Sequence, residues 1–369
     1  MRRALAVSLF LAGPLAAQSP IYPDPNGGTG FEFRTFQFDR AFDLQSASQV
    51  VVPVFAGTPI GSRLFVDLTA NYAHTRLRWL DGTETNLSGL TDSQLRFSYT
   101  LGRDLAVVST SINLPTGKSS ISSQQLTVLR STAQDFLPFP VSNYGTSAGV
   151  TGGWVVARRV GDWSIGLAGS LRYVSTYQPF TDVPGDFSPG MEGRMRIGVL
   201  RPVGERTTIT TGFTFSNFGT DELTGTSNFD YRSGNRYVGE VGLSHLVGRS
   251  TLELTAWTYF RAAGDSNNVS VQTAKENLHY GRAAIAIPVT DRLQIDPSFE
   301  TRFWIAGDGS DGQLYGLNVR ARYNASPYLT IAPSLHYDGG NIKLVEPGVL
   351  PLTSSITGFG GALLVRYSR

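Results

Sequence analysis

The chain contains no cysteine, and this absence excludes several classes of protein. Disulfide frameworks and thiolate metal sites both require cysteine. A lipoprotein needs a cysteine directly after its signal peptide, so lipid anchoring is excluded too. The histidine and acidic residues show no metal-ligand spacing either, so we expect no metal and no cofactor.

Charge is also scarce in this sequence. Charged residues make up 16% of the 369 residues, below the ~25% typical of soluble domains. The 31 Lys and Arg nearly balance the 29 Asp and Glu, so we expect no nucleic acid as partner. No apolar run reaches the ~20 residues of a membrane-spanning helix. This combination leaves an unusually apolar soluble β-protein or a transmembrane barrel, whose strands alternate in polarity.

The first residues have the layout of a secretory signal peptide. Arg2 and Arg3 precede an apolar run over residues 4–15, and the small residues Ala16 and Ala17 follow. We predict a cleaved signal peptide over residues 1–17, a short periplasmic segment over 18–30 and an outer-membrane barrel over 31–369. The predicted location is the outer membrane of a Gram-negative-type bacterium.

Alternation of apolar and polar residues is the strongest structural signal. Within 292–305, Leu293, Ile295, Phe299 and Phe303 alternate with Gln294, Asp296, Glu300 and Arg302. Similar runs recur along the chain, and many reach the ~9–11 residues that a tilted strand needs to cross a bilayer. Short connections alternate with long ones, as in barrels with periplasmic turns and external loops.

These patterns predict an all-β fold, namely a transmembrane antiparallel up-and-down β-barrel of about sixteen strands. Fourteen strands is the alternative, because the segments 31–38 and 47–55 have weaker periodicity. Either even number places both termini in the periplasm.

Charged residues recur at the positions predicted to face inward. We interpret them as the lining of a hydrated lumen, since charges inside a barrel must be paired or wet. The alternative is an ion-pair lattice that stiffens a plugged barrel. The predicted lumen-lining residues are Arg96, Arg172, Arg194, Arg196, Glu240, Glu253, Arg282, Asp296, Glu300, Arg302, Arg320 and Arg322.

The longest predicted loop spans residues 115–146. Leu126, Leu129, Ala133 and Phe136 have helical spacing and predict an apolar stripe, and Phe139 follows it. We predict that Leu126, Leu129, Phe136 and Phe139 belong to a loop that folds into the lumen as a constriction. The alternative is a loop packed over the rim. The expected docking surface on the inner wall consists of Trp257, Tyr259 and Trp304.

Catalysis is not expected. The four histidines, His74, His245, His279 and His336, fall on different predicted strands. His336 and Asp338 share the predicted inward face, but a Ser/His/acid site would also need a nearby nucleophile, which the sequence does not place. We therefore predict that the chain is not an enzyme and that it has no catalytic residue.

Two neighbouring segments resemble a known group of barrels. They are Leu95-Arg96-Phe97-Ser98-Tyr99 and Ile112-Asn113-Leu114-Pro115-Thr116-Gly117-Lys118. They resemble Gram-negative outer-membrane barrels of the phenol meta-pathway and hydrophobic-substrate transporter group. The resemblance implies uptake of aromatic or other apolar small molecules.

The expected function is an outer-membrane channel or transporter for small molecules, in particular apolar or aromatic organic solutes, by passive or facilitated diffusion. The alternative is a non-transporting structural or adhesive barrel that displays external loops. The expected partners are outer-membrane lipid, the barrel assembly machinery and a small-molecule solute. The sequence leaves the oligomeric state open.

Overall fold

The computed structural model describes residues 24–39, 43–102, 106–225, 228–267, 273–345 and 351–369. The predicted signal peptide lies outside these residues. Helix is confined to η1 (Ser123–Gln125) and α1 (Leu126–Thr132) within the described part of the chain. Among the described residues, no helix is long and apolar enough to cross a membrane.

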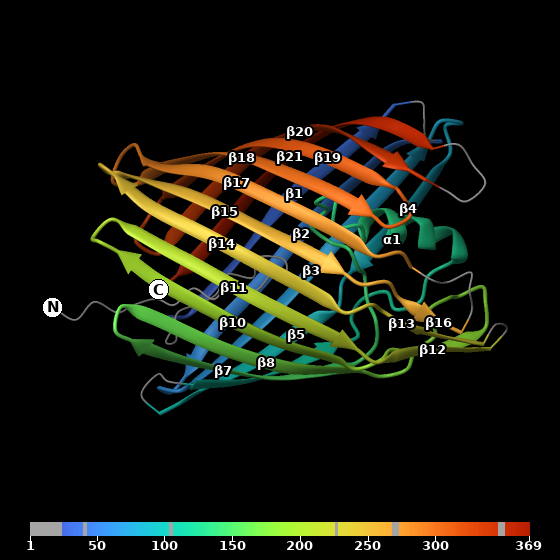
Figure 1. Ribbon diagram of the computed structural model, residues 1–369, viewed down its shortest axis with the longest axis horizontal. Coiled ribbons are helices and arrows are strands. Elements are labelled where there is room, and N and C mark those ends of the chain that lie inside the picture. Colours follow the sequence, from blue (N-terminus) through green and yellow to red (C-terminus); the bar gives the residue numbers. More distant parts are fainter. Residues whose placement is uncertain (1–23, 40–42, 103–105, 226–227, 268–272, 346–350) are drawn as a thin grey trace.

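Strands form the wall of a barrel (Figure 1). In chain order they are β1 (Asn26–Phe38), β2 (Leu44–Ile60), β3 (Leu64–Trp79), β4 (Glu84–Leu90), β5 (Ser93–Leu101), β6 (Ala106–Leu114), β7 (Gly149–Val160), β8 (Trp163–Val174), β10 (Glu192–Val203), β11 (Thr207–Phe218), β14 (Arg236–Val247), β15 (Ser250–Arg261), β17 (Glu276–Pro288), β18 (Leu293–Ala306), β19 (Asp311–Asn324), β20 (Leu329–Leu344) and β21 (Leu352–Ser368).

The barrel is closed by antiparallel pairing of its first and last strands. β1 pairs with β21 from Asn26 opposite Ser368 to Phe38 opposite Ile356. The sheet contains 17 strand segments, but β4 and β5 both pair with β3 and share one position of the wall. The barrel therefore has sixteen strands, as the main prediction states, and the alternative of fourteen is wrong. β1 begins at Asn26, earlier than residue 31, where the sequence predicts the barrel to start.

The two ends of the barrel differ. Tight turns and the C-terminus lie at the left end in Figure 1. Five of these turns use a glycine with φ between 59° and 67°, namely Gly61, Gly102, Gly161, Gly204 and Gly248. Glycine adopts this left-handed backbone without the steric cost of a Cβ, so a strand can reverse within two or three residues.

Long loops gather at the right end. Three of them pair with one another as a small external sheet of β9 (Gly185–Ser188), β12 (Thr220–Gly225), β13 (Phe229–Arg232) and β16 (Asp265–Ser266). A fourth, between β6 and β7, carries α1. Because tight turns are periplasmic and long loops external in such barrels, the right end is the external one.

The two faces of the wall differ in polarity. On β19, Tyr315, Leu317 and Val319 are exposed, and Leu317 has 60% of its surface accessible. Asn318 and Arg320, which alternate with them, point to the other face, because successive strand residues face opposite sides. An exposed apolar belt around a closed barrel is the surface that contacts lipid.

Candidate functional site

The charged residues predicted to line the lumen occupy alternate strand positions that share one face of the wall. Asp296 on β18 lies opposite Arg320 on β19, and its Oδ2 is 3.2 Å from Nη2 of Arg322. Further round the wall, Arg196 on β10 forms an ion pair with Glu240 on β14. The apolar belt lies on the opposite face of these strands, so this face is the inner one.

Other members of the predicted set form ion pairs along the same face. Arg282 lies between two carboxylates, 3.7 Å from Glu253 and 3.6 Å from Glu300. Nε of Arg96 lies 2.9 Å from Oδ2 of Asp67. These pairs connect neighbouring strands, as the lattice interpretation expects. The loop between β6 and β7 determines how much of the lumen beside these ion pairs is free.

Residues 115–148 connect β6 to β7 and fold into the barrel; we call them the lumen loop. Val128, Phe136 and Tyr144 are almost fully buried, with Phe136 only 1% exposed. Val128 and Tyr144 pack in an apolar cluster with residues of β2, β3 and β4, including Leu87. Phe136 packs in a second cluster with residues of β1 and of β15–β21, including Leu278. The lumen loop therefore covers the inner wall from β15 round to β4.

The apolar stripe of the lumen loop differs from the predicted one. α1 ends at Thr132, so it contains Leu126 and Leu129 but not Phe136. The prediction of one helical stripe through Phe136 is therefore wrong. In the last turn of α1, the Ser131 and Thr132 hydroxyls donate to the carbonyls of Thr127 and Val128, a contact that weakens a helix. Pro138 lacks a backbone N–H and prevents continuation of the helix further along the chain.

The stripe consequently divides between two docking surfaces. Leu126 and Leu129 pack against the cluster of β2–β4. The Phe136 ring lies 6.1 Å from that of Trp304, and the Phe139 ring meets Phe36 edge-on at 5.2 Å. The expected docking residues Trp257, Tyr259 and Trp304 all belong to the cluster that surrounds Phe136.

Buried polar contacts fix the far end of the lumen loop. The Gln49 amide donates to the Val141 carbonyl at 2.7 Å and accepts from the Val141 N–H at 2.8 Å. It also donates to the Thr75 hydroxyl, which lies 2.6 Å from the Tyr144 hydroxyl. Burial raises the pKa of Tyr144 to about 12, so the phenol stays protonated. Fully satisfied buried networks of this kind specify a single arrangement.

Two arginines of the wall hold the tip of the lumen loop. Arg34 Nη1 donates to the Pro138 carbonyl at 3.0 Å, and Arg302 Nη1 donates to the Asp135 carbonyl at 3.1 Å. Burial raises the pKa of the Asp135 carboxyl, although Arg236 and other arginines nearby oppose this shift. Arg302, predicted to line the lumen, is thus engaged by the loop.

Asp92 clamps both ends of the lumen loop. It lies between β4 and β5, where the wall strand is interrupted. Its Oδ1 accepts from the Gly117 N–H at 3.1 Å, at the start of the loop. Its Oδ2 accepts from the Asn113 amide at 2.8 Å and from the Thr146 N–H and hydroxyl at 2.7 and 3.2 Å. One carboxylate therefore receives four hydrogen bonds from the loop and its base.

Thr116 and Gly117 belong to the segment 112–118, which carries the family resemblance, and both have specific roles in this clamp. The Thr116 hydroxyl accepts from the Ser93 N–H at 2.8 Å and donates to the Thr91 carbonyl at 3.0 Å. A Cβ at Gly117 would lie 2.1 Å from the Tyr144 carbonyl oxygen. Only glycine fits there, so this motif turns the chain from β6 into the lumen.

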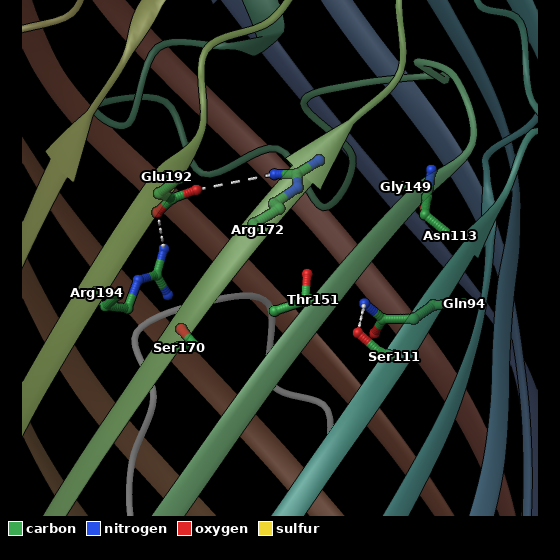
Figure 2. A pocket seen from close by; sticks show the side chains of 9 residues that line it. All are labelled: Gln94, Ser111, Asn113, Gly149, Thr151, Ser170, Arg172, Glu192 and Arg194. Carbon is green, nitrogen blue, oxygen red and sulfur yellow. Dashed lines mark hydrogen bonds and ion pairs between the residues drawn. The ribbon is translucent and has the colours of Figure 1, made fainter.

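The inner wall beyond the lumen loop is polar and lined by small residues. We call the inner face of β5, β6, β7, β8 and β10 the open wall. A cavity of about 290 Å³ lies against it (Figure 2). Its lining residues are Gln94, Ser111, Asn113, Gly149, Thr151, Ser170, Arg172, Glu192 and Arg194.

Sequence reasoning missed several residues of this site. Glu192, which pairs with Arg172 and Arg194, directly follows a long loop and lies at the very start of β10. Asp92 and Gln49 also went unassigned. Pairing of β5 with β6 brings Asp92 next to the residues that it clamps. No local sequence pattern predicts that contact.

A closed sixteen-stranded antiparallel barrel with an apolar outer belt, a polar inner face and long loops at one end is a transmembrane β-barrel of the outer-membrane type. No protein-family model matches the sequence, and no curated protein matches it either.

Solved structures do match the chain. It is similar to a FadL homologue of Pseudomonas aeruginosa, with a TM-score of 0.48, 10% identity and coverage of 98% of this chain and 96% of that chain. It is similar to the CymD monoaromatic hydrocarbon channel, with a TM-score of 0.45, 10% identity and coverage of 94% of this chain and 89% of that chain. It is also similar to an anion-selective porin of Comamonas acidovorans, with a TM-score of 0.44, 11% identity and coverage of 94% of this chain and 98% of that chain.

Proposed function

We propose that this barrel is a passive outer-membrane channel for small molecules. Its constriction is the passage between the lumen loop and the open wall. The observation that carries the proposal is the one-sided docking of the loop, which covers β15 to β4 and leaves a cavity against β5 to β10. A loop that plugged the barrel would have to pack against the open wall as well.

The proposed solutes are polar or amphipathic. The apolar residues of the inner wall that could hold an apolar solute are largely covered by the lumen loop. The open wall presents hydroxyls, amides and charged groups instead. Where the lumen loop meets β15 and β17, the stacked rings of Trp257 and Tyr280 are only half-buried, so an aromatic solute with polar groups also fits. This differs from the wholly apolar solutes that the family resemblance implies.

The second candidate is a structural or adhesive barrel without transport. The external sheet of β9, β12, β13 and β16 supports it, because paired loops form an ordered surface outside the membrane. The two candidates differ in the lumen, which is sealed in a structural barrel and open in a channel. Absence of catalysis stays a prediction from the sequence under both.

Conductance in planar lipid bilayers tests the proposal. Purified protein should insert in steps and carry an ohmic current in 1 M KCl, because water fills the passage beside the lumen loop. Heat-modified migration on a gel should first show that the barrel is folded. Folded protein that inserts without carrying current would contradict the proposal and favour the structural candidate.

A further inference from the structure

The charges of the cavity are unequal. Glu192 is the one carboxylate among the nine lining residues, and it serves two guanidinium groups. Its Oε1 lies 2.7 Å from Nη2 of Arg194, while its Oε2 lies 3.9 Å from Nη1 of Arg172 (Figure 2). The Arg172 side chain is 47% exposed. One positive charge is therefore left over, and Arg172 is the group that is less tightly paired.

Hydroxyl and amide groups surround these charges. The hydroxyls of Thr151 and Ser170 make no hydrogen bond to other described residues and are available to a solute. The Gln94 amide makes a 3.3 Å bond to Ser111. The neighbouring carboxylate of Asp92 accepts four hydrogen bonds from the lumen loop and its base, and it is not one of the nine lining residues. None of the nine described residues that line the cavity has an aromatic or aliphatic side chain.

We propose that this cavity is a binding subsite for small carboxylates that also carry hydroxyl groups. The inference rests on the proposed channel function and names the solute class for it. A guanidinium binds a carboxylate with two parallel hydrogen bonds, which suits the less tightly paired Arg172. The hydroxyl groups of the solute then bind to Thr151, Ser170 and Gln94. The nine lining residues offer no apolar side chain against which an alkyl chain could pack. A cavity of about 290 Å³ holds one molecule of this size.

Glu192 keeps the binding weak enough for release. A channel subsite must attract its solute and also let it leave. The carboxylate of Glu192 competes with that of the solute for both arginines. Neutralising Glu192 should therefore tighten binding, whereas neutralising Arg172 should weaken it. Opposite effects from adjacent residues would not follow from general damage to the wall.

Three six-carbon probes separate charge from hydroxyl recognition. Gluconate carries a carboxylate and hydroxyls, hexanoate only the carboxylate, and glucose only the hydroxyls. Block of the KCl current by each probe is measured in planar bilayers with the full protein. Gluconate should block at about tenfold lower concentration than hexanoate, because its hydroxyl groups add neutral hydrogen bonds, each of which contributes up to about 1.5 kcal/mol. Glucose should block least of the three.

Variants connect this selectivity to the cavity. Arg172→Gln should raise the half-blocking gluconate concentration about tenfold, and Glu192→Gln should lower it. Arg201→Gln is the matched control, because Arg201 lies on the outer face, over the Trp163 ring, and should change nothing. Equilibrium binding of radiolabelled gluconate to the detergent-solubilised protein gives a readout that needs no conducting lumen.

The outcomes distinguish the two proposals. Equal block by gluconate and hexanoate, or equal responses of Arg172→Gln and Arg201→Gln, would overturn the subsite. A channel whose KCl current is not blocked by gluconate would contradict the subsite but not the channel function. Gluconate binding that depends on Arg172 in a barrel that carries no current would support the subsite and contradict the channel.

Discussion

Replacement of residues 121–140 by a short glycine–serine linker should raise the single-channel conductance severalfold. The segment contains α1 and the buried Phe136, and it occupies the side of the lumen between β15 and β4. No wall strand is cut, so the barrel should still close through β1 and β21. Planar-bilayer recordings of the variant and the parent protein, made in the same salt, measure the change.

Removal of the β12–β13 hairpin is the matched control for this deletion. That hairpin belongs to the external sheet, so its removal shortens a loop without emptying the lumen. Conductance should then stay near that of the parent protein. Equal conductance of the parent and the lumen-loop variant, in a barrel that migrates as folded, would mean that the loop does not narrow the path.

Asp92→Ala should release the base of the lumen loop. The Gly117 and Thr146 N–H groups would lose their acceptor, and each unsatisfied donor costs about 1–3 kcal/mol. The loop should then open on the order of 100-fold more often, which is the effect of about 2.7 kcal/mol. Limited proteolysis in detergent, with cleavage mapped to the lumen loop, measures this opening. Channel currents should also become noisier.

Asp81→Ala is the control for the clamp. Asp81 also accepts hydrogen bonds from a threonine N–H and hydroxyl, those of Thr83, and these bonds lower the pKa of Asp81. It lies in the exposed turn between β3 and β4, and its hydrogen bonds are to that turn and not to the lumen loop. Similar cleavage rates for the two alanine variants would show that Asp92 does not hold the loop.

Much of the barrel could be predicted because its physics is local. A strand that faces lipid on one side and water on the other must alternate in polarity, so residues 292–305 predict β18 directly. The residues assigned to the inner face follow from the same alternation. The start of β1 was harder to predict, because its glycine-rich first residues carry no such alternation.

The arrangement inside the barrel could not be predicted in the same way. Helical spacing links Leu126 to Phe136, but these residues dock on different sides of the lumen, and only closure of the wall creates those sides. Asp92 reads as an ordinary turn residue until β5 and β6 bring it to Gly117. The balance between Glu192 and two arginines likewise depends on pairing between β8 and β10.

Cysteine accessibility along β8 tests the central claim most directly, because the chain has no cysteine of its own. Ser170 lies on the open wall, and its neighbour Leu171 is exposed on the lipid-facing side. With Ser170→Cys, a charged, membrane-impermeant thiol reagent should reduce the single-channel current within one recording. With Leu171→Cys, the same reagent should leave the current unchanged. A current insensitive to the reagent in both variants would contradict a solute path along the open wall.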